Sequence, residues 1–114
     1  MPDPFDRVRA IALTFSDVKE SLTFGSPSLK VNGKYLAQMG QDSTSLILSM
    51  EIMERDFWLD AEPDIFFITD HFRDWPGVLI RMDQIDDELL SDLLDKAWRR
   101  RAPKKLVKAY DESK

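Results

Sequence analysis

Residues 24–37 read FGSPSLKVNGKYLA, and this stretch predicts two antiparallel strands joined by a tight turn. Gly25-Ser26-Pro27 breaks the chain before the first strand, and Asn32-Gly33 is a typical hairpin turn between the two. Strand-like alternation continues on both sides of the stretch. The middle of the chain is therefore expected to form an antiparallel sheet.

The length of the Asn-Gly loop decides which side chains face the core. A two-residue loop would place Val31 opposite Lys34 and leave both faces mixed. A three-residue loop with Gly33 at positive φ would pair Lys30 with Lys34 and leave Leu36 on the exposed face. It would gather the other apolar residues on one face, namely Leu29, Tyr35, Ala37 and Met39. A buried face selects register strongly, so we expect the three-residue loop.

The remaining segments complete an α+β pattern. Alternation predicts strands over residues 19–24, 28–31, 34–39, 44–50, 64–70 and 77–82. Helical spacing predicts helices over about 3–15, 51–60 and 86–102, with one further turn over 103–110. This order favours a mainly antiparallel sheet packed on one face by the N- and C-terminal helices. The chain is expected to form a single domain over residues 1–114.

The helix over 86–102 has a wide apolar face and oppositely charged ends. Leu90, Leu94 and Trp98 repeat every four residues, so we expect Trp98 and Leu94 to be buried together. Acidic residues begin this helix and Arg99, Arg100 and Arg101 end it, as the helix dipole favours.

Composition excludes several classes of function. The chain has no cysteine, which excludes disulfides, thiol catalysis and Cys-ligated zinc. It has no glycine-rich phosphate loop, and no other pattern identifies a cofactor, a metal site or a reaction. No apolar run is long enough for a membrane span, and the start of the chain lacks the pattern of a signal peptide. We therefore expect a cytoplasmic protein that is not an enzyme and has no cofactor.

Charge is distributed unevenly along the chain. Residues 96–114 contain eight Lys/Arg and two Asp/Glu, a net charge of +6, whereas residues 1–95 carry −11. Such a basic segment can contact phosphates. The candidate nucleic-acid-binding residues are Arg99, Arg100, Arg101, Lys104, Lys105, Lys30 and Lys34. Because the whole chain carries −5, any DNA binding is expected to be weak and salt-dependent.

Two other functions remain open. A protein-interaction module could use the exposed sheet face, where the expected register leaves Leu36 uncovered. A small-molecule binder or enzyme could use the loop around His71, the single histidine. Nearby aromatic side chains could line a pocket there, namely Phe66, Phe67, Phe72 and Trp75. A hydrolase triad would need a nucleophile and an acid converging on His71, and the sequence shows only that such residues exist. No HExxH-like metal-ligand spacing includes His71.

Three separated segments resemble the MmcQ/YjbR family of small bacterial proteins: FGSPSLKVNGKYLA (24–37), FFITDHFRDWPGVLIR (66–81) and AWRRRAPKKL (97–106). The resemblance extends from Ile11 to about Leu106. It implies a CyaY-like (frataxin-like) α+β fold and DNA binding as the expected function, and it supplies no catalytic residues. Frataxins carry a dense acidic ridge on their first helix, whereas the first helix here carries only Asp6 as an acid. Iron binding is therefore not implied.

Overall fold

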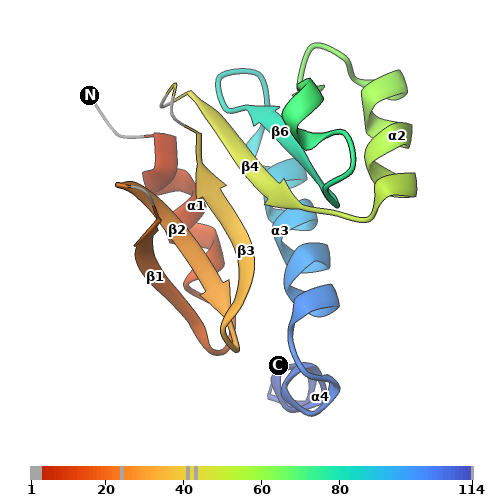
Figure 1. The fold of residues 1–114 in the computed structure, drawn as a ribbon. Coiled ribbons are helices and arrows are strands. Elements are labelled where there is room, and N and C mark those ends of the chain that lie inside the picture. Colours follow the sequence, from red (N-terminus) through yellow and green to blue (C-terminus); the bar gives the residue numbers. More distant parts are fainter. Residues whose placement is uncertain (1–3, 24, 41, 43, 114) are drawn as a thin grey trace.

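The computed structural model describes residues 4–23, 25–40, 42 and 44–113, which form helices packed on a six-stranded sheet (Figure 1). In chain order the elements are α1 (Pro4–Ala12), β1 (Val18–Thr23), β2 (Ser26–Val31), β3 (Lys34–Met39), β4 (Ser45–Ser49), α2 (Ile52–Ala61), β5 (Phe66–Phe67), the short 3-10 helix η1 (Asp70–Phe72), β6 (Gly77–Arg81), α3 (Asp87–Arg101) and α4 (Lys104–Glu112).

The sheet has the strand order β1-β2-β3-β4-β6-β5, and every neighbouring pair is antiparallel. Helices α1 and α3 lie side by side on one face of it, and the opposite face is turned toward the viewer in Figure 1. We call that opposite face the open face. The predicted fold class, an α+β domain with an antiparallel sheet covered on one face by terminal helices, is confirmed.

The core lies between the sheet and these two helices, and Trp98 is the largest of its fully buried side chains. Trp98 and Leu94 are both fully buried, as predicted. The Trp98 ring stacks on Phe15 with centroids 5.7 Å apart and contacts Tyr110 at 4.8 Å. Its Nε1 donates a 2.9 Å hydrogen bond to the carbonyl oxygen of Ser16. One side chain on α3 therefore joins the segment after α1 to α4.

The predicted three-residue hairpin loop is wrong. Val31 pairs with Lys34 across a two-residue turn, in which Asn32 has φ 52° and Gly33 has φ 75°. Both turn residues have the positive φ of the usual Asn-Gly hairpin turn. Only the positive φ of Gly33 was predicted correctly.

A β-bulge explains why the apolar pattern misled the prediction. Lys30 pairs with Tyr35, but Leu29 pairs with Ala37, so Leu36 is an extra residue in β3. A bulge shifts the alternation by one residue within a strand, which the sequence pattern alone cannot separate from a longer loop. Leu36 is consequently fully buried rather than uncovered, and Tyr35 lies on the open face instead of in the core.

Gly33 offers a direct test of this turn. The expected result of Gly33→Ala is a loss of about 1–2 kcal/mol in the free energy of unfolding, because an L-residue is strained at positive φ. A Cβ at this position meets no atom within 4 Å, so backbone conformation alone sets the effect. Urea denaturation measures it, with Asn32→Gly, which removes rather than adds such strain, as the control. Equal stability of wild type and Gly33→Ala would contradict the turn.

The C-terminal segment is more helical than predicted, and one predicted strand is shorter. Residues expected to add one turn form the nine-residue helix α4, while the strand predicted over 64–70 is reduced to the two residues of β5. None of the helices in the described part of the chain has both the length and the apolar character needed to cross a membrane.

Candidate functional site

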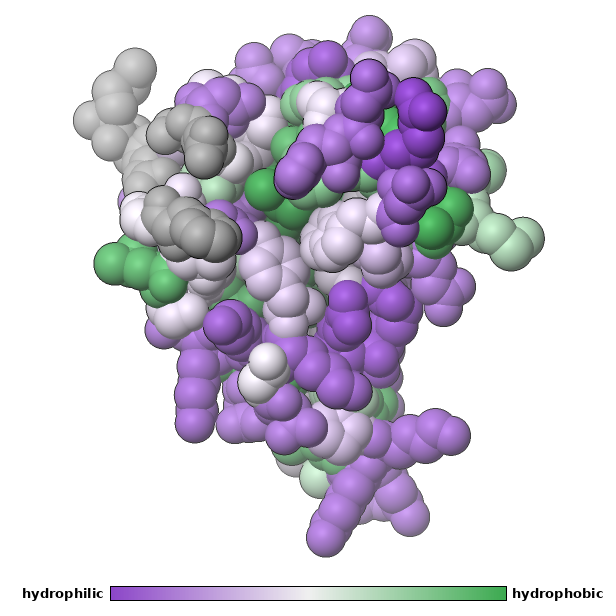
Figure 2. Space-filling model, viewed as in Figure 1, coloured by the Kyte–Doolittle hydropathy of each residue, from purple (hydrophilic) through white to green (hydrophobic). Residues whose placement is uncertain are grey.

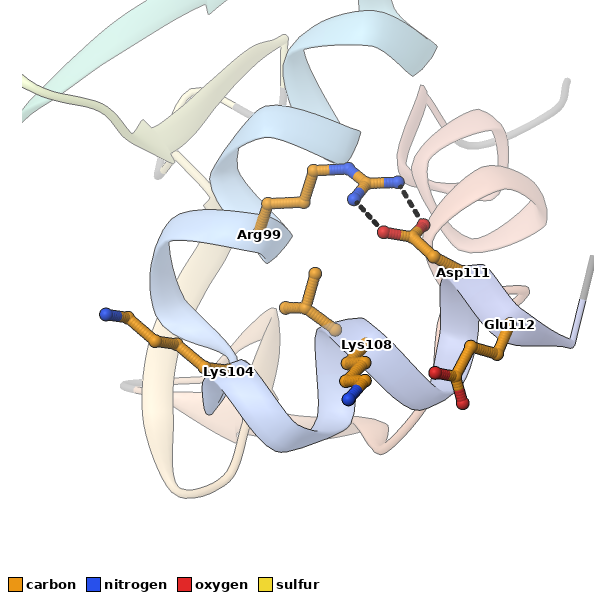
Figure 3. A pocket seen from close by; sticks show the side chains of 6 residues that line it. Arg99, Lys104, Lys108, Asp111 and Glu112 are labelled. Atoms are coloured by element: carbon orange, nitrogen blue, oxygen red, sulfur yellow. Dashed lines mark hydrogen bonds and ion pairs between the residues drawn. The ribbon is translucent and has the colours of Figure 1, made fainter.

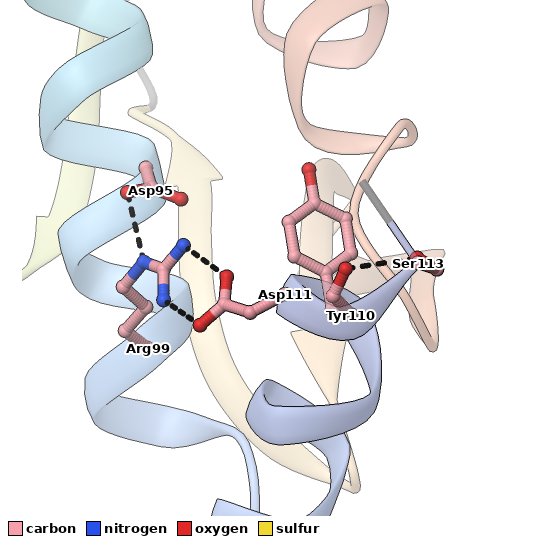
Figure 4. A network of polar contacts seen from close by, with 5 residues as sticks. All are labelled: Asp95, Arg99, Tyr110, Asp111 and Ser113. Atoms are coloured by element: carbon pink, nitrogen blue, oxygen red, sulfur yellow. Dashed lines mark hydrogen bonds and ion pairs between the residues drawn. The ribbon is translucent and has the colours of Figure 1, made fainter.

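Arg99 is held by two carboxylates. Its Nε donates to Asp95 at 3.0 Å, and its two Nη atoms donate to the two oxygens of Asp111 at 2.9 and 2.8 Å (Figure 4). The hydrogen bond to Asp111, and to a smaller extent the one to Asp95, raises the pKa of Arg99 above its usual value. The side chain thus fastens α4 to α3, and its charge is balanced within the protein.

Arg100 and Arg101 converge on one serine of the sheet. Arg100 Nη2 donates to Ser49 Oγ, and Arg101 Nε donates to the same oxygen at 2.9 Å. Partial burial, with a smaller contribution from the Arg101 charge, lowers the pKa of Arg100 from its usual value. A guanidinium carries five N–H donors, so both side chains keep donors for a further partner. Ser49, a buried hydroxyl ending an apolar strand, was not singled out from the sequence.

Three lysines stand on the outer surface of α4. Lys104, Lys105 and Lys108 are exposed, and none of them forms an ion pair with any described residue. Figure 3 shows that Lys104 and Lys108 point away from the Arg99–Asp111 pair. Lys108 was not among the predicted residues, although it follows Lys104 by four positions and so lies one turn further along α4.

The structure does not bring Lys30 and Lys34 together. Lys30 pairs with Tyr35 on one side and with Lys19 on the other, so it belongs to the open face. Lys34 pairs with Val31 at the hairpin end, and that pair belongs to the face covered by helices. Strand alternation therefore places these two lysines on opposite faces of the sheet.

The predicted aromatic cluster around His71 divides between two faces. Phe66 is buried in the core. Phe67 lies under the Arg81 guanidinium, 4.3 Å from its ring centroid. Phe72 and Trp75 do line a pocket with His71, on the open face of the sheet.

Arg55 supports this pocket from behind, and sequence analysis missed it. It is 5% exposed and lies in α2, where an arginine normally reaches solvent. Its Nη1 donates to the carbonyl oxygens of Phe72, Arg73 and Trp75 at 3.1–3.3 Å. Arg55 thereby fixes the path of the segment that carries the pocket's aromatic rings. No sequence signal identifies it, because all three partners are backbone atoms of a distant loop.

Comparisons with known proteins agree with the resemblance. A family model described as YjbR matches residues 13–100. A 49-residue stretch is 43% identical to uncharacterized proteins of Mycobacterium tuberculosis (Rv2570) and Mycobacterium bovis (Mb2600). That stretch covers 43% of this chain and only 38% of each of these curated relatives.

One solved structure has the same fold. The crystal structure of Deinococcus radiodurans protein DR2400, whose family-model domain is DUF419, superposes with a TM-score of 0.75. The match covers 99% of this chain and 91% of that one, at 20% sequence identity. At this identity the likeness shows the fold alone.

Proposed function

The chain belongs to the YjbR family, and we propose that this member binds nucleic acid weakly through cations at the end of α3 and on α4. We call these residues the cationic surface: Arg100, Arg101, Lys104, Lys105 and Lys108. The carrying observation is that none of the five forms an ion pair with a described residue. Cations that are not neutralised by a carboxylate are available for phosphate groups, and Arg100 and Arg101 keep N–H donors beyond those used on Ser49.

The contrast with other arginines supports this choice. Arg7, Arg9, Arg73 and Arg99 each pair with a carboxylate at 2.5–3.0 Å. Residues 96–110 hold seven Lys/Arg and no acid, so the cationic surface has few acids near it in sequence. Compared with the predicted set, the cationic surface leaves out Arg99, which Asp95 and Asp111 neutralise, and the sheet lysines Lys30 and Lys34. It gains Lys108 on α4.

The expected affinity for nucleic acid is low and does not depend on the base sequence. The rest of the chain is acidic and repels a polyanion at long range. The cationic surface offers positive charges that contact phosphate groups. Such contacts do not depend directly on the base sequence of the nucleic acid. Dissociation constants of about 10⁻⁴–10⁻⁶ M are typical of such binding. We propose a binding domain in the cytoplasm and assign it no reaction and no cofactor.

The test compares two triple variants that lose the same charge. Replacing Lys104, Lys105 and Lys108 by Ala should weaken binding to a labelled 20-base-pair duplex at least about tenfold, since three phosphate contacts are lost. The matched control replaces Lys19, Lys30 and Lys34 by Ala, and the expected loss is under about threefold. Fluorescence anisotropy at 50 mM salt measures both.

The control variant also defines the results that would contradict binding at the cationic surface. Equal weakening of both variants would show that net charge, and not the cationic surface, determines binding. A larger loss in the control would move the site to the hairpin lysines. Urea denaturation checks that the variants remain folded, because surface substitutions usually change stability by less than about 0.5 kcal/mol.

Helix α2 favours protein interaction as a second candidate. Met53 is 86% exposed and Phe57 is 61% exposed, one helical turn away, with Ile52 beside them at 40%. Several large apolar side chains together in water mark interaction surfaces more reliably than single ones. This observation replaces the predicted use of Leu36, which is buried. Sedimentation velocity at rising concentration would show whether the partner is a second copy of the chain.

A further inference from the structure

The open face of the sheet has a pocket of about 740 Å³ beneath the segment 71–75. Ile47 and Leu79, which pair across β4 and β6, form its apolar floor. Figure 2 shows this face, where pale and green side chains occupy the middle and purple ones surround them. Small-molecule sites in proteins are typically apolar hollows of about 300–1,000 Å³. The pocket is therefore of a size suited to a small ligand.

A chain of aromatic rings lines the pocket. His71 contacts Phe72 at 5.2 Å between centroids, Phe72 contacts Trp75 at 5.7 Å, and Trp75 contacts Tyr35 at 5.7 Å. All three contacts are edge-to-face. Aromatic edges and faces attract further rings in the same arrangements, so this lining favours a planar aromatic ligand.

The backbone holds these rings in place before any ligand arrives. A Cβ at Gly77 would overlap the Trp75 ring, so glycine at this position allows the indole to lie directly on β6. Arg55 fixes the carbonyl groups of the same segment from the other side. A pre-ordered lining reduces the entropy lost on binding.

A pair of polar side chains gives the pocket a hydrogen-bonding edge. Tyr35 Oη donates to Gln38 Oε1, and Gln38 Nε2 donates to the carbonyl oxygen of Thr23 at 3.2 Å. Burial raises the pKa of Tyr35, which keeps the phenol protonated near neutral pH. The phenol oxygen can also accept, and the Gln38 amide has a second N–H. The Tyr35 oxygen and the Gln38 N–H can therefore hydrogen-bond to a ligand ring that carries one donor and one acceptor.

Charge restricts the ligand further. Asp42 lines the pocket, and hydrogen bonds from the backbone N–H groups of Thr44 and Ser45 lower the pKa of its carboxyl group. It is therefore ionised at neutral pH. No Lys or Arg is found among the described residues that line the pocket. An anion would meet an unbalanced carboxylate there, whereas a cation would be attracted to it.

We propose that this open-face pocket binds a small, planar aromatic molecule that is neutral or cationic. The pocket and the cationic surface share no residue, and the proposed ligand of the pocket is not an anion. The proposal therefore does not depend on nucleic-acid binding.

Three probes with one indole ring test the charge rule. Tryptamine is a cation, indole is neutral and indole-3-acetate is an anion at pH 7. The expected order of affinity is tryptamine, then indole, then indole-3-acetate, with about tenfold between the first and the last from the Asp42 charge. Titrations followed by the backbone amide shifts of Gly40 and Gly77 report binding at the pocket.

Single substitutions distinguish binding in the pocket from nonspecific binding to exposed aromatic rings. Trp75→Ala should weaken tryptamine binding at least about fivefold, whereas Phe57→Ala removes an exposed ring elsewhere and should leave it unchanged. Asp42→Asn keeps an oxygen for the Thr44 and Ser45 N–H groups. The Asp42→Asn substitution should reduce the tenfold preference for tryptamine over indole-3-acetate to less than about threefold. Amide dispersion in the same spectra shows whether each variant is folded.

Several outcomes would overturn the proposal. No shift at Gly40 or Gly77 with 5 mM tryptamine or indole would exclude an aromatic ligand. Indole-3-acetate binding as tightly as tryptamine would remove the charge rule, as would an unchanged preference in Asp42→Asn. Equal effects of Trp75→Ala and Phe57→Ala would show that the rings of the pocket are not the site.

Discussion

Trp98→Ala is expected to lower the free energy of unfolding by about 3–5 kcal/mol, the range for removing a large aromatic side chain from a core. Trp98 is fully buried, stacks on Phe15 and donates to the Ser16 carbonyl group. The substitution leaves a cavity and an unpaired carbonyl oxygen at the contact between α1 and α3. Urea denaturation followed by circular dichroism measures the loss.

Trp58 provides the matched control for this prediction. It is another tryptophan on a helix, only partly buried, with its ring 5.1 Å from that of Phe66. Trp58→Ala is expected to cost less than half as much as Trp98→Ala, because part of its surface already contacts water. A loss below about 1 kcal/mol for Trp98→Ala would contradict the buried position of that side chain.

Arg55→Met is expected to cost about 2–4 kcal/mol. The substitution keeps an apolar stem of similar length but leaves the carbonyl groups of Phe72, Arg73 and Trp75 without their donor. Each buried group left unpaired costs about 1–3 kcal/mol, and some of these oxygens will regain water. Hydrogen exchange of the amides in 70–77 should accelerate, since the segment loses its attachment to α2.

Arg73→Met is the comparison for Arg55. The Arg73 side chain is 70% exposed and pairs only with Asp70, three residues earlier, among the described residues. Exposed ion pairs contribute about 0–1 kcal/mol, so little change is expected. If both variants lost equally little stability and exchange in 70–77 stayed slow, Arg55 would not be holding this segment.

Local periodicity was enough to predict most of the fold. The apolar stripe of Leu90, Leu94 and Trp98 correctly identified the buried side of α3, because a helix repeats its contacts every three or four residues. The hairpin register could not be predicted in this way. The bulge at Leu36 depends on packing across the sheet, and only that packing decides between a bulge and a longer loop.

The candidate site was only partly predictable, because charge pairing is a tertiary property. The sequence identified a basic segment but not that Asp111, on α4, would neutralise Arg99, on α3. No sequence pattern singled out Arg55 either, because its partners are the backbone carbonyl groups of a distant loop. Of the residues that line the open-face pocket, only His71, Phe72 and Trp75 were predicted to line one. Tyr35 was missed because the wrong hairpin register placed its side chain in the core.

The central claim is that the lysines of the cationic surface contact phosphates, and the salt dependence of binding tests it most directly. Each phosphate contact on duplex DNA contributes about −0.9 to the slope of log K against log salt. Anisotropy titrations between 50 and 200 mM salt should give a slope at least as steep as about −2.7. Replacing Lys104, Lys105 and Lys108 by Ala should flatten that slope by about 2.7. Absence of binding at 50 mM salt and 100 μM protein, or an unchanged slope in the triple variant, would contradict the claim.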